Sequence, residues 1–384
     1  MLDWLIKNAQ LNDALFPWLF NPINKIFRPD PRVFLSLVFV IFTLFCIFMK
    51  RLTHPMLWTV VGAAFFFLFI VGLSNEDFFL IVTKADNVPI VMLIVLVYFY
   101  TWWAFRQAVL NDEYKAKAEK AALKVSNTPN NDPEEKHHTF PFLVHPEFIS
   151  TIVCAVILTV WSIVLDAPLE QPSEAARTPN PSKAPWYFLG LQEMLVYFDP
   201  WMAGVVMPTY IIVGLMAIPY FDANKKGNGY FTWAERKGAI ASFMFGFVIL
   251  WCVLIVLGTM MRGPGWNFFG PFEHWDHNRV ESLTNVNLSE YHAMIPGFTW
   301  ITPSTFWPVR ESSGIVLSLF YLIGIPFLAA KTIFKKLYAE MGPLRYYVGT
   351  HMVLMMMTLP IKMYLRWLIN LKYLIWIPEI GINL

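Results

Sequence analysis

Long apolar segments limit most tightly how this chain can fold. A helix needs about 20 apolar residues to cross the hydrocarbon core of a bilayer. Eight segments reach or approach this length, the first being short. They are Val33–Met49, Pro55–Leu73, Val88–Phe105, Phe148–Leu165, Met202–Phe221, Ala239–Met261, Gly314–Phe334 and Tyr346–Leu368. The sequence therefore predicts an all-α fold, a polytopic transmembrane helical bundle with about eight spanning helices.

Composition agrees with a chain surrounded by lipid. Charged residues make up 15% of the chain and hydrophobic residues 57%, whereas soluble domains carry about 25% charged residues. The net charge of +2 gives no basic surface for nucleic acid. We therefore expect membrane lipids as partners and no nucleic acid. The first thirty residues mix charged and apolar groups without a small-residue cleavage site, so we expect no removable signal peptide.

Basic residues alternate between the connections of these eight segments. Loops after the odd-numbered segments contain sixteen Lys and Arg, and loops after the second, fourth and sixth contain six. Cytoplasmic loops hold the excess of Lys and Arg in membrane proteins. The count predicts that residues 167–201 and both termini lie on the outer side of the membrane. The connection 106–145 is then cytoplasmic, and its stretch "NDEYKAKAEKAALK" is predicted to be helical.

Metal and haem ligands are scarce in the sequence. The three cysteines lie in separate apolar segments and form no C-x-x-C pair. Of the eight histidines, His351 alone lies inside an apolar segment, so no two can face each other across a haem. "EHWDH", Glu273 to His277, lacks a convincing third ligand for zinc. We therefore predict no metal site and no haem ligands in this chain.

A short aromatic segment between the fourth and fifth apolar runs holds the candidate chemistry. Pro179, Pro181 and Pro185 exclude a helix through its first part, and residues 186–198 can then form a short interfacial helix. Gln192 and Glu193 fall inside that apolar turn. Because an unpaired carboxylate at a membrane is costly, an acid in this position indicates a functional site.

This segment resembles a known family. Ala184-Pro185-Trp186-Tyr187-Phe188, followed by Gln192 and Glu193, is similar to the Pro-Glu-Trp-Tyr loop between the first two C-terminal helices of cytochrome b. "IPYFDAN", Ile218 to Asn224, resembles the end of the next helix in that family. The resemblance covers roughly residues 146–335, matching the C-terminal half of cytochrome b or subunit IV of the bc and b6f complexes.

The resemblance implies a site for quinol oxidation. In the family this loop lines the outer quinol-oxidation pocket, and the motif Glu accepts a quinol proton. Here Pro185 stands at that position and Ala184 at the leading Pro. We predict Glu193 as the replacement acceptor, with Asp199 as second choice. Glu193 and Tyr187 are the predicted catalytic residues, and the predicted quinol-binding residues are Ala184, Pro185, Trp186, Tyr187, Phe188 and Gln192.

The same resemblance implies partners. The chain is expected to work in a bacterial inner membrane with a haem b-bearing cytochrome b subunit, a Rieske iron–sulfur protein carrying a 2Fe-2S cluster, and a c-type cytochrome. The outer connection 262–313 is a hypothetical docking surface for the last two. The expected function is that of a quinol:cytochrome c oxidoreductase subunit that couples electron transfer to proton release. The alternative is a transporter or a structural anchor without redox function.

Four segments are predicted along the chain. Residues 1–105 form an N-terminal three-helix membrane module, and residues 106–145 form the linker. Residues 146–335 form the four-helix domain that resembles cytochrome b, and residues 336–384 form an additional helix and tail. On that last helix Lys362, Arg366 and Lys372 either extend toward lipid headgroups or line a quinone or headgroup pocket.

Overall fold

The protein is described by a computed structural model. It describes residues 20–24, 31–124, 138–164, 178–222, 231–281, 283–297 and 304–384, with positions 172, 174–176, 299–300 and 302. The predicted irregular half of the linker, residues 126–138, lies outside the described residues except for His138, and so do Ala223 and Asn224.

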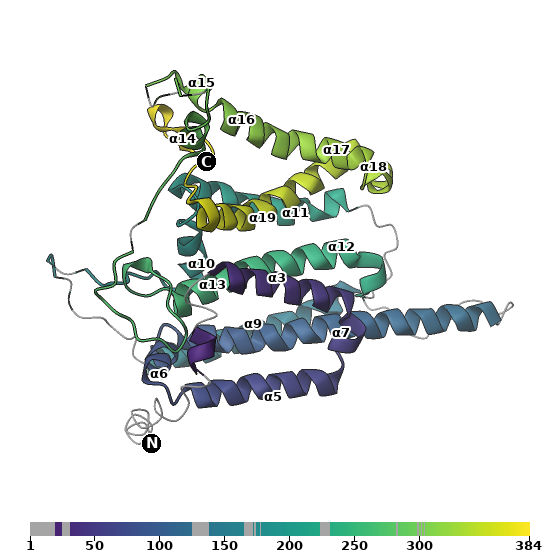
Figure 1. Cartoon of the computed structure of the whole chain (residues 1–384). Helices are drawn as coiled ribbons and strands as arrows, with labels where there is room; N and C mark the ends of the chain where they lie inside the picture. The colour runs from purple at the N-terminus through teal and green to yellow at the C-terminus, as the bar shows by residue number, and fades with distance from the viewer. Residues whose placement is uncertain are drawn as a thin grey trace. The chain divides into compact units, whose positions relative to one another are not determined.

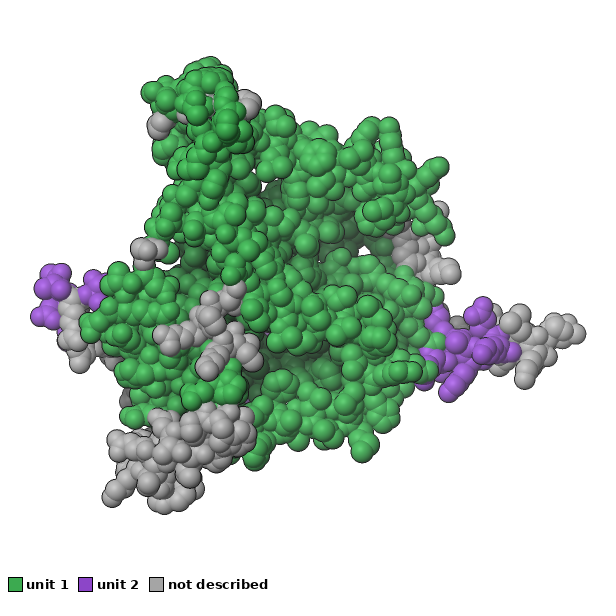
Figure 2. Space-filling view, viewed as in Figure 1, with its two compact units in different colours: residues 1–112, 179–384 green, residues 113–178 purple. Residues whose placement is uncertain are grey.

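Contacts divide the chain into two units, which Figure 2 shows in different colours. One unit comprises residues 1–112 and 179–384, and the other residues 113–178. The second unit contains the end of α7 (Val88–Lys124), then α8 (Thr139–Phe142) and α9 (Val144–Val164). The helix α9 has 21 residues and is mostly apolar. The four sequence segments proposed above remain a prediction.

Helices dominate the described chain, which confirms the all-α polytopic fold. Seven of its helices are long and apolar enough to cross a membrane, namely Pro55–Gly72, Val88–Lys120, Thr139–Val164, Met202–Phe221, Trp233–Met261, Ser312–Lys331 and Pro343–Ile369. The first predicted span forms the apolar helix α3 (Pro31–Ile47), which has 17 residues. It therefore lies at the short end of the range for a membrane span.

Several of these spans are built from consecutive helical pieces. The remaining elements of the first unit are α4 (Met49–Leu52), α5 (Pro55–Gly72), α6 (Glu76–Thr83), α10 (Trp186–Met194), η1 (Met202–Val206), α11 (Met207–Phe221), α12 (Trp233–Met244), η2 (Phe245–Cys252), α13 (Val253–Val256), η3 (Leu257–Met261), η4 (Pro264–Trp266), α14 (Leu288–Ala293), α15 (Trp307–Arg310), α16 (Ser312–Leu319), η5 (Phe320–Gly324), α17 (Ile325–Lys331), α18 (Lys335–Met341), α19 (Pro343–Ile369), β1 (Trp376–Ile377), η6 (Pro378–Ile380) and β2 (Ile382–Asn383).

Proline and apolar side chains explain where these helices begin and continue. Pro55 and Pro343 occupy the first turns of α5 and α19, where a missing N–H costs nothing. The helix α7 runs beyond its apolar part to Lys124, which confirms the predicted helical start of the linker. The strands β1 and β2 pair antiparallel near the C-terminus.

The largest group of buried apolar side chains joins α10 to α3 and to three spanning helices. Leu35 of α3, Leu254 of α13 and Met363 of α19 belong to it, together with Tyr197 and Met202. Figure 1 shows α19 alongside α11 and α3 alongside α12. The short helix α10 is therefore fixed against the bundle by its buried face.

Connections predicted to share a side of the membrane contact one another. The Asp77 side chain after α5 pairs with His274 at 2.9 Å between Oδ1 and Nδ1, and the backbone of Val286 bridges to Leu371. In the other set of loops, the Asn111 side chain donates to the carbonyl of Phe231. These contacts join the second connection to the sixth, the sixth to the C-terminal segment, and the third to the fifth.

The interfacial helix is shorter than predicted. It ends at Met194, with Leu195 as its C-cap, rather than at Phe198. Pro200 begins the next segment and disfavours a helical conformation for Asp199. The chain between them forms turns, which bring the Tyr197 side chain back toward the helix.

Candidate functional site

The loop before α10 is held against that helix by Gln192. Its Oε1 accepts from the backbone N–H of Ala184 at 2.8 Å, and its Nε2 donates to the carbonyl of Ser182 at 2.9 Å. Pro185 is exposed and Ala184 is half-buried. The amide of Gln192, predicted to bind quinol, is therefore engaged in fixing the loop that carries Ala184 and Pro185.

Three consecutive aromatic residues begin the helix α10 and differ in how far their side chains are exposed. Trp186 packs on the buried side chains of Ile90 and Ile255. Tyr187 and Phe188 are each 52% exposed, and their ring centroids are 4.8 Å apart. The Trp186 indole is thus packed against the core, whereas the rings of Tyr187 and Phe188 form an aromatic surface that a ligand or a partner subunit can contact.

Glu193 lies on the opposite, buried side of α10 and has no exposed surface. Its Oε1 accepts from Arg262 Nη2 at 2.7 Å and from the Tyr197 hydroxyl at 3.0 Å. Its Oε2 accepts from Arg262 Nε at 3.0 Å and from Trp266 Nε1 at 3.2 Å. Each carboxylate oxygen therefore already has two donors, which satisfies a buried charge.

Arg262 completes this network from the end of η3. Its guanidinium, 5% exposed as a residue, lies 3.6 Å from the ring centroid of Phe268 and donates through Nη1 to the carbonyl of Trp266. Burial by itself lowers the pKa of Arg262, but Glu193 and Tyr197 outweigh burial and raise that pKa. Burial, and then the charge of Glu193, raise the pKa of the Tyr197 phenol. The guanidinium thus stays charged and the phenol protonated at neutral pH.

Lys183 extends from the loop toward the same end of η3. Its Nζ donates to the carbonyl of Thr259 at 2.7 Å and lies 4.8 Å from the ring centroid of Trp275. Burial lowers the pKa of the Lys183 amine to about 7. The charges of Lys84 and Arg262 act in the same direction, and Glu193 acts against them. The amine therefore exists in both protonation states near neutral pH.

The family comparison covers α10 and most of the residues around it. Residues 172–273 match the family model of cytochrome b(C-terminal)/b6/petD. This part of the chain is therefore similar to that family. No solved structure matches the chain at a significant level.

The matched cytochrome b segment is narrower than the range predicted from the motif, which was 146–335. It contains α10, the aromatic residues, Glu193 and Arg262, and it ends at Glu273. Together with the apolar helices, it indicates a multi-pass membrane protein with a segment similar to the C-terminal part of cytochrome b. The family works within bc and b6f complexes, so partner subunits are implied.

Asp199 lies inside the matched segment, and Lys362 and Arg366 lie outside it on α19; none of the three hydrogen-bonds to Glu193. Asp199, the second-choice acceptor, accepts from the Tyr373 hydroxyl at 3.0 Å. Burial and Asp199 raise the pKa of that phenol to about 12. Lys362 is buried within α19, which differs from a side chain extended to headgroups, and Arg366 donates to the carbonyls of Thr284 and Asn370.

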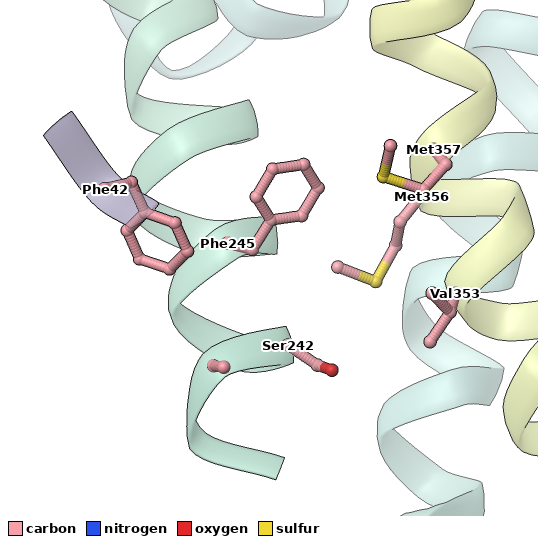
Figure 3. A pocket seen from close by; sticks show the side chains of 7 residues that line it. Phe42, Ser242, Phe245, Val353, Met356 and Met357 are labelled. Atoms are coloured by element: carbon pink, nitrogen blue, oxygen red, sulfur yellow. The ribbon is translucent and has the colours of Figure 1, made fainter. Parts of the chain in front are cut away.

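No cluster of three or more His, Cys, Asp or Glu suited to a metal ion occurs among the described residues. A cavity of about 210 Å³ lies elsewhere in the bundle, between side chains of α3, the α12–η2 span and α19 (Figure 3). Its lining includes Phe42, Phe245 and Met356. None of the predicted site residues lines this cavity.

Sequence reasoning placed Glu193 in the site but missed the groups that surround it. The charge pattern of the loops treats Arg262 as one more loop cation. Its position directly after a long apolar run is the missed signal, because a charge there needs a partner. Its partner is 69 residues away in the sequence. Lys183 was also passed over, although it is adjacent to the quoted motif. No local pattern predicts that it bends back onto Thr259.

Proposed function

We propose that this chain is the membrane subunit that contributes the outer quinol-oxidation site to a quinol:cytochrome c oxidoreductase. The observation that carries the proposal is the exposed aromatic surface of Tyr187 and Phe188, next to Trp186, which packs against the core. All three residues lie inside the segment that matches the cytochrome b family model. A quinol ring is flat and apolar with a hydroxyl at each end, so it suits stacking on such a surface.

Each residue of the surface has a distinct part in this proposal. The rings of Tyr187 and Phe188 contact the quinol ring. Trp186 packs against the core and so fixes the position of the first turn of α10. The Tyr187 hydroxyl offers a hydrogen bond to a quinol hydroxyl. The Gln192 bridge keeps Ala184 and Pro185 in place at the entrance. A partner subunit closes the exposed side and limits water.

The proton-accepting role of Glu193 stays a prediction. In the described conformation both of its oxygens are occupied, so accepting a quinol proton requires the carboxylate to leave Arg262. Substituting E193Q keeps the shape of the side chain and removes its charge. Full quinol oxidation by an assembled E193Q complex would assign proton transfer to another group.

The redox cofactors belong to partners in this proposal. A bis-His haem needs two opposed ring nitrogens, and His351, within α19, holds its Nδ1 against the carbonyl of Tyr347. Haem b is therefore assigned to a separate cytochrome b subunit. The first electron goes to a Rieske 2Fe-2S protein and onward to a c-type cytochrome.

The membrane orientation is part of the same proposal. We assign the chain to a bacterial inner membrane with the loop before α10 on the outer side. The excess of Lys and Arg in the opposite loops supports this assignment. Protons released at that side, while electrons pass inward to haem b, add to the transmembrane potential.

Replacing one exposed ring tests the proposal. In the purified complex, F188A should lower kcat/KM for quinol by about tenfold or more, since aromatic contacts contribute about 1 kcal/mol beyond their buried area. F247A is the matched control, because Phe247 is also an exposed ring but lies in η2. Equal activities for F188A, F247A and wild type would contradict the proposed site.

A further inference from the structure

The cavity between α3, the α12–η2 span and α19 has no part in the proposed quinol site. Its volume is about 210 Å³, and its lining is apolar except for the hydroxyl of Ser242. Val353 and Met357, which line it, are 45% and 36% exposed, so the cavity reaches the surface of the bundle. An apolar cavity of about 150 Å³ stays dry and binds benzene. This cavity therefore suits a segment of a hydrocarbon chain.

A basic residue continues the lining of the cavity along each of two helices. On α12, Lys237, Ala241 and Phe245 follow one another at a spacing of four residues, and on α19 Arg345 precedes Val353 by eight. Residues at this spacing form one ridge along the surface of a helix. Lys237 thus lies about 6 Å along the axis from the first lining residue of α12, and Arg345 about 12 Å from that of α19.

Both basic residues lie at the same end of the bundle. Asp222, at the end of α11, pairs with Arg236 of α12. The ring of Phe221 lies beside Gly349 of α19. The first turns of α12 and α19 are therefore both close to the end of α11. The count of Lys and Arg in the loops assigns this end to the cytoplasmic side.

The polar groups around the cavity are available to a ligand. Lys237 and Arg345 are exposed, and neither forms an ion pair within the described chain. The hydroxyl of Ser242 forms no hydrogen bond to a described residue, and Figure 3 shows it directed toward the space between α12 and α19. A ligand that satisfies these groups carries an anion, a hydrogen-bond acceptor and a hydrocarbon chain, in that order. The neutral head of a quinone would leave both cations unpaired.

We propose that this cavity, together with Lys237 and Arg345, binds an anionic phospholipid of the cytoplasmic leaflet. One acyl chain enters between Phe245 and Met356, an ester carbonyl accepts from Ser242, and the phosphate lies against the two cations. The choice of leaflet rests on the proposed orientation, whereas the site does not depend on quinol oxidation. The lipid links α12, inside the segment that matches the family model, to α3 and α19, which lie outside it.

Lipid retention tests the role of the two cations. Native mass spectrometry of the purified complex, incubated with phosphatidylglycerol or with phosphatidylcholine, counts the lipid molecules that stay bound. Wild type should retain phosphatidylglycerol in preference to phosphatidylcholine. K237Q and R345Q should each lower the affinity for phosphatidylglycerol by about fivefold. The control K336Q removes a 92% exposed cation that lies 4.0 Å from Glu340, so it should behave as wild type.

Equal retention of the two lipids by wild type would overturn the proposal. Affinities for phosphatidylglycerol that K237Q and R345Q leave unchanged would overturn it as well, because the phosphate would then lie elsewhere.

Filling the cavity tests where the acyl chain lies. A241F places a ring in the cavity and should abolish the preferential retention of phosphatidylglycerol. A239F is the matched control, since Ala239 is exposed on the same helix and does not line the cavity. An A241F complex that retains phosphatidylglycerol as wild type does would reject the cavity as the site.

A measurement on wild type decides if A241F fails to assemble. Phosphatidylglycerol with a photoreactive group in its acyl chain should label the peptide that contains Val353 and Met356. Excess phosphatidylglycerol should suppress this labelling. Labelling that excess quinone suppresses and excess phosphatidylglycerol does not would assign the cavity to a quinone tail and overturn the proposal. Labelling confined to other segments would also overturn it.

Discussion

The ion pair of Glu193 and Arg262 has almost no contact with solvent. Four hydrogen bonds from three side chains satisfy the carboxylate, and the Phe268 ring covers the guanidinium. Removing one partner of such a pair leaves an uncompensated charge in an apolar environment. The network therefore fixes α10, and with it the aromatic surface, to the end of η3.

We predict that R262Q destabilises the protein by about 3–5 kcal/mol, because Glu193 loses its counter-charge. Thermal unfolding of the purified protein followed by circular dichroism measures the change. R236Q is the matched control, since Arg236 pairs with Asp222 where both side chains are about one-third exposed. That control should cost at most about 1 kcal/mol. Similar losses for both variants would contradict a special role for the buried pair.

The C-terminal segment after α19 is an element that packs back onto α15 and α16. Arg310 donates to both oxygens of Glu379, and Glu311 accepts from the backbone N–H of Trp376. At Gly314, the backbone of α16 approaches the carbonyl oxygen of Leu374 so closely that a Cβ would clash with it. Because Gly314 has no side chain, the C-terminal segment can pack closely against α16.

We predict that G314A displaces this segment. Because the obstructing atom belongs to the backbone, the contact cannot be relieved by rotating a side chain. Limited proteolysis should cut the C-terminal residues faster in G314A than in wild type. In the control G204A, the added methyl group meets nothing within 4 Å, so its cleavage rate should stay unchanged. Equal protection of G314A and wild type would reject this packing.

The helices of the bundle could be predicted from the apolar segments of the sequence. Apolar runs located the seven spanning helices, although three of these helices extend well beyond the run at one end. A bilayer demands length and hydrophobicity regardless of tertiary partners. The aromatic motif likewise located α10. The Glu193–Arg262 pair was not predictable, because it joins segments 69 residues apart. The end of α10 was misplaced by four residues, since turns around Tyr197 have no apolar signature.

Orientation of the bundle gives a further prediction. Cysteines introduced by D276C and K336C lie in connections that we assign to opposite sides of the membrane. A membrane-impermeant maleimide added to intact cells should label D276C and leave K336C unlabelled until the membrane is broken. The native cysteines, which lie in apolar helices, should react with neither treatment. The reverse pattern would place the loop before α10 inside the cell.

Photolabelling by a quinol analogue tests the central claim most directly. A photoreactive quinol is bound to the purified complex, and the labelled peptides are identified by mass spectrometry. The account predicts adducts on Trp186, Tyr187 or Phe188 that excess quinol suppresses. Competable adducts confined to other segments, such as the cavity beside Phe245 and Met356, would contradict it.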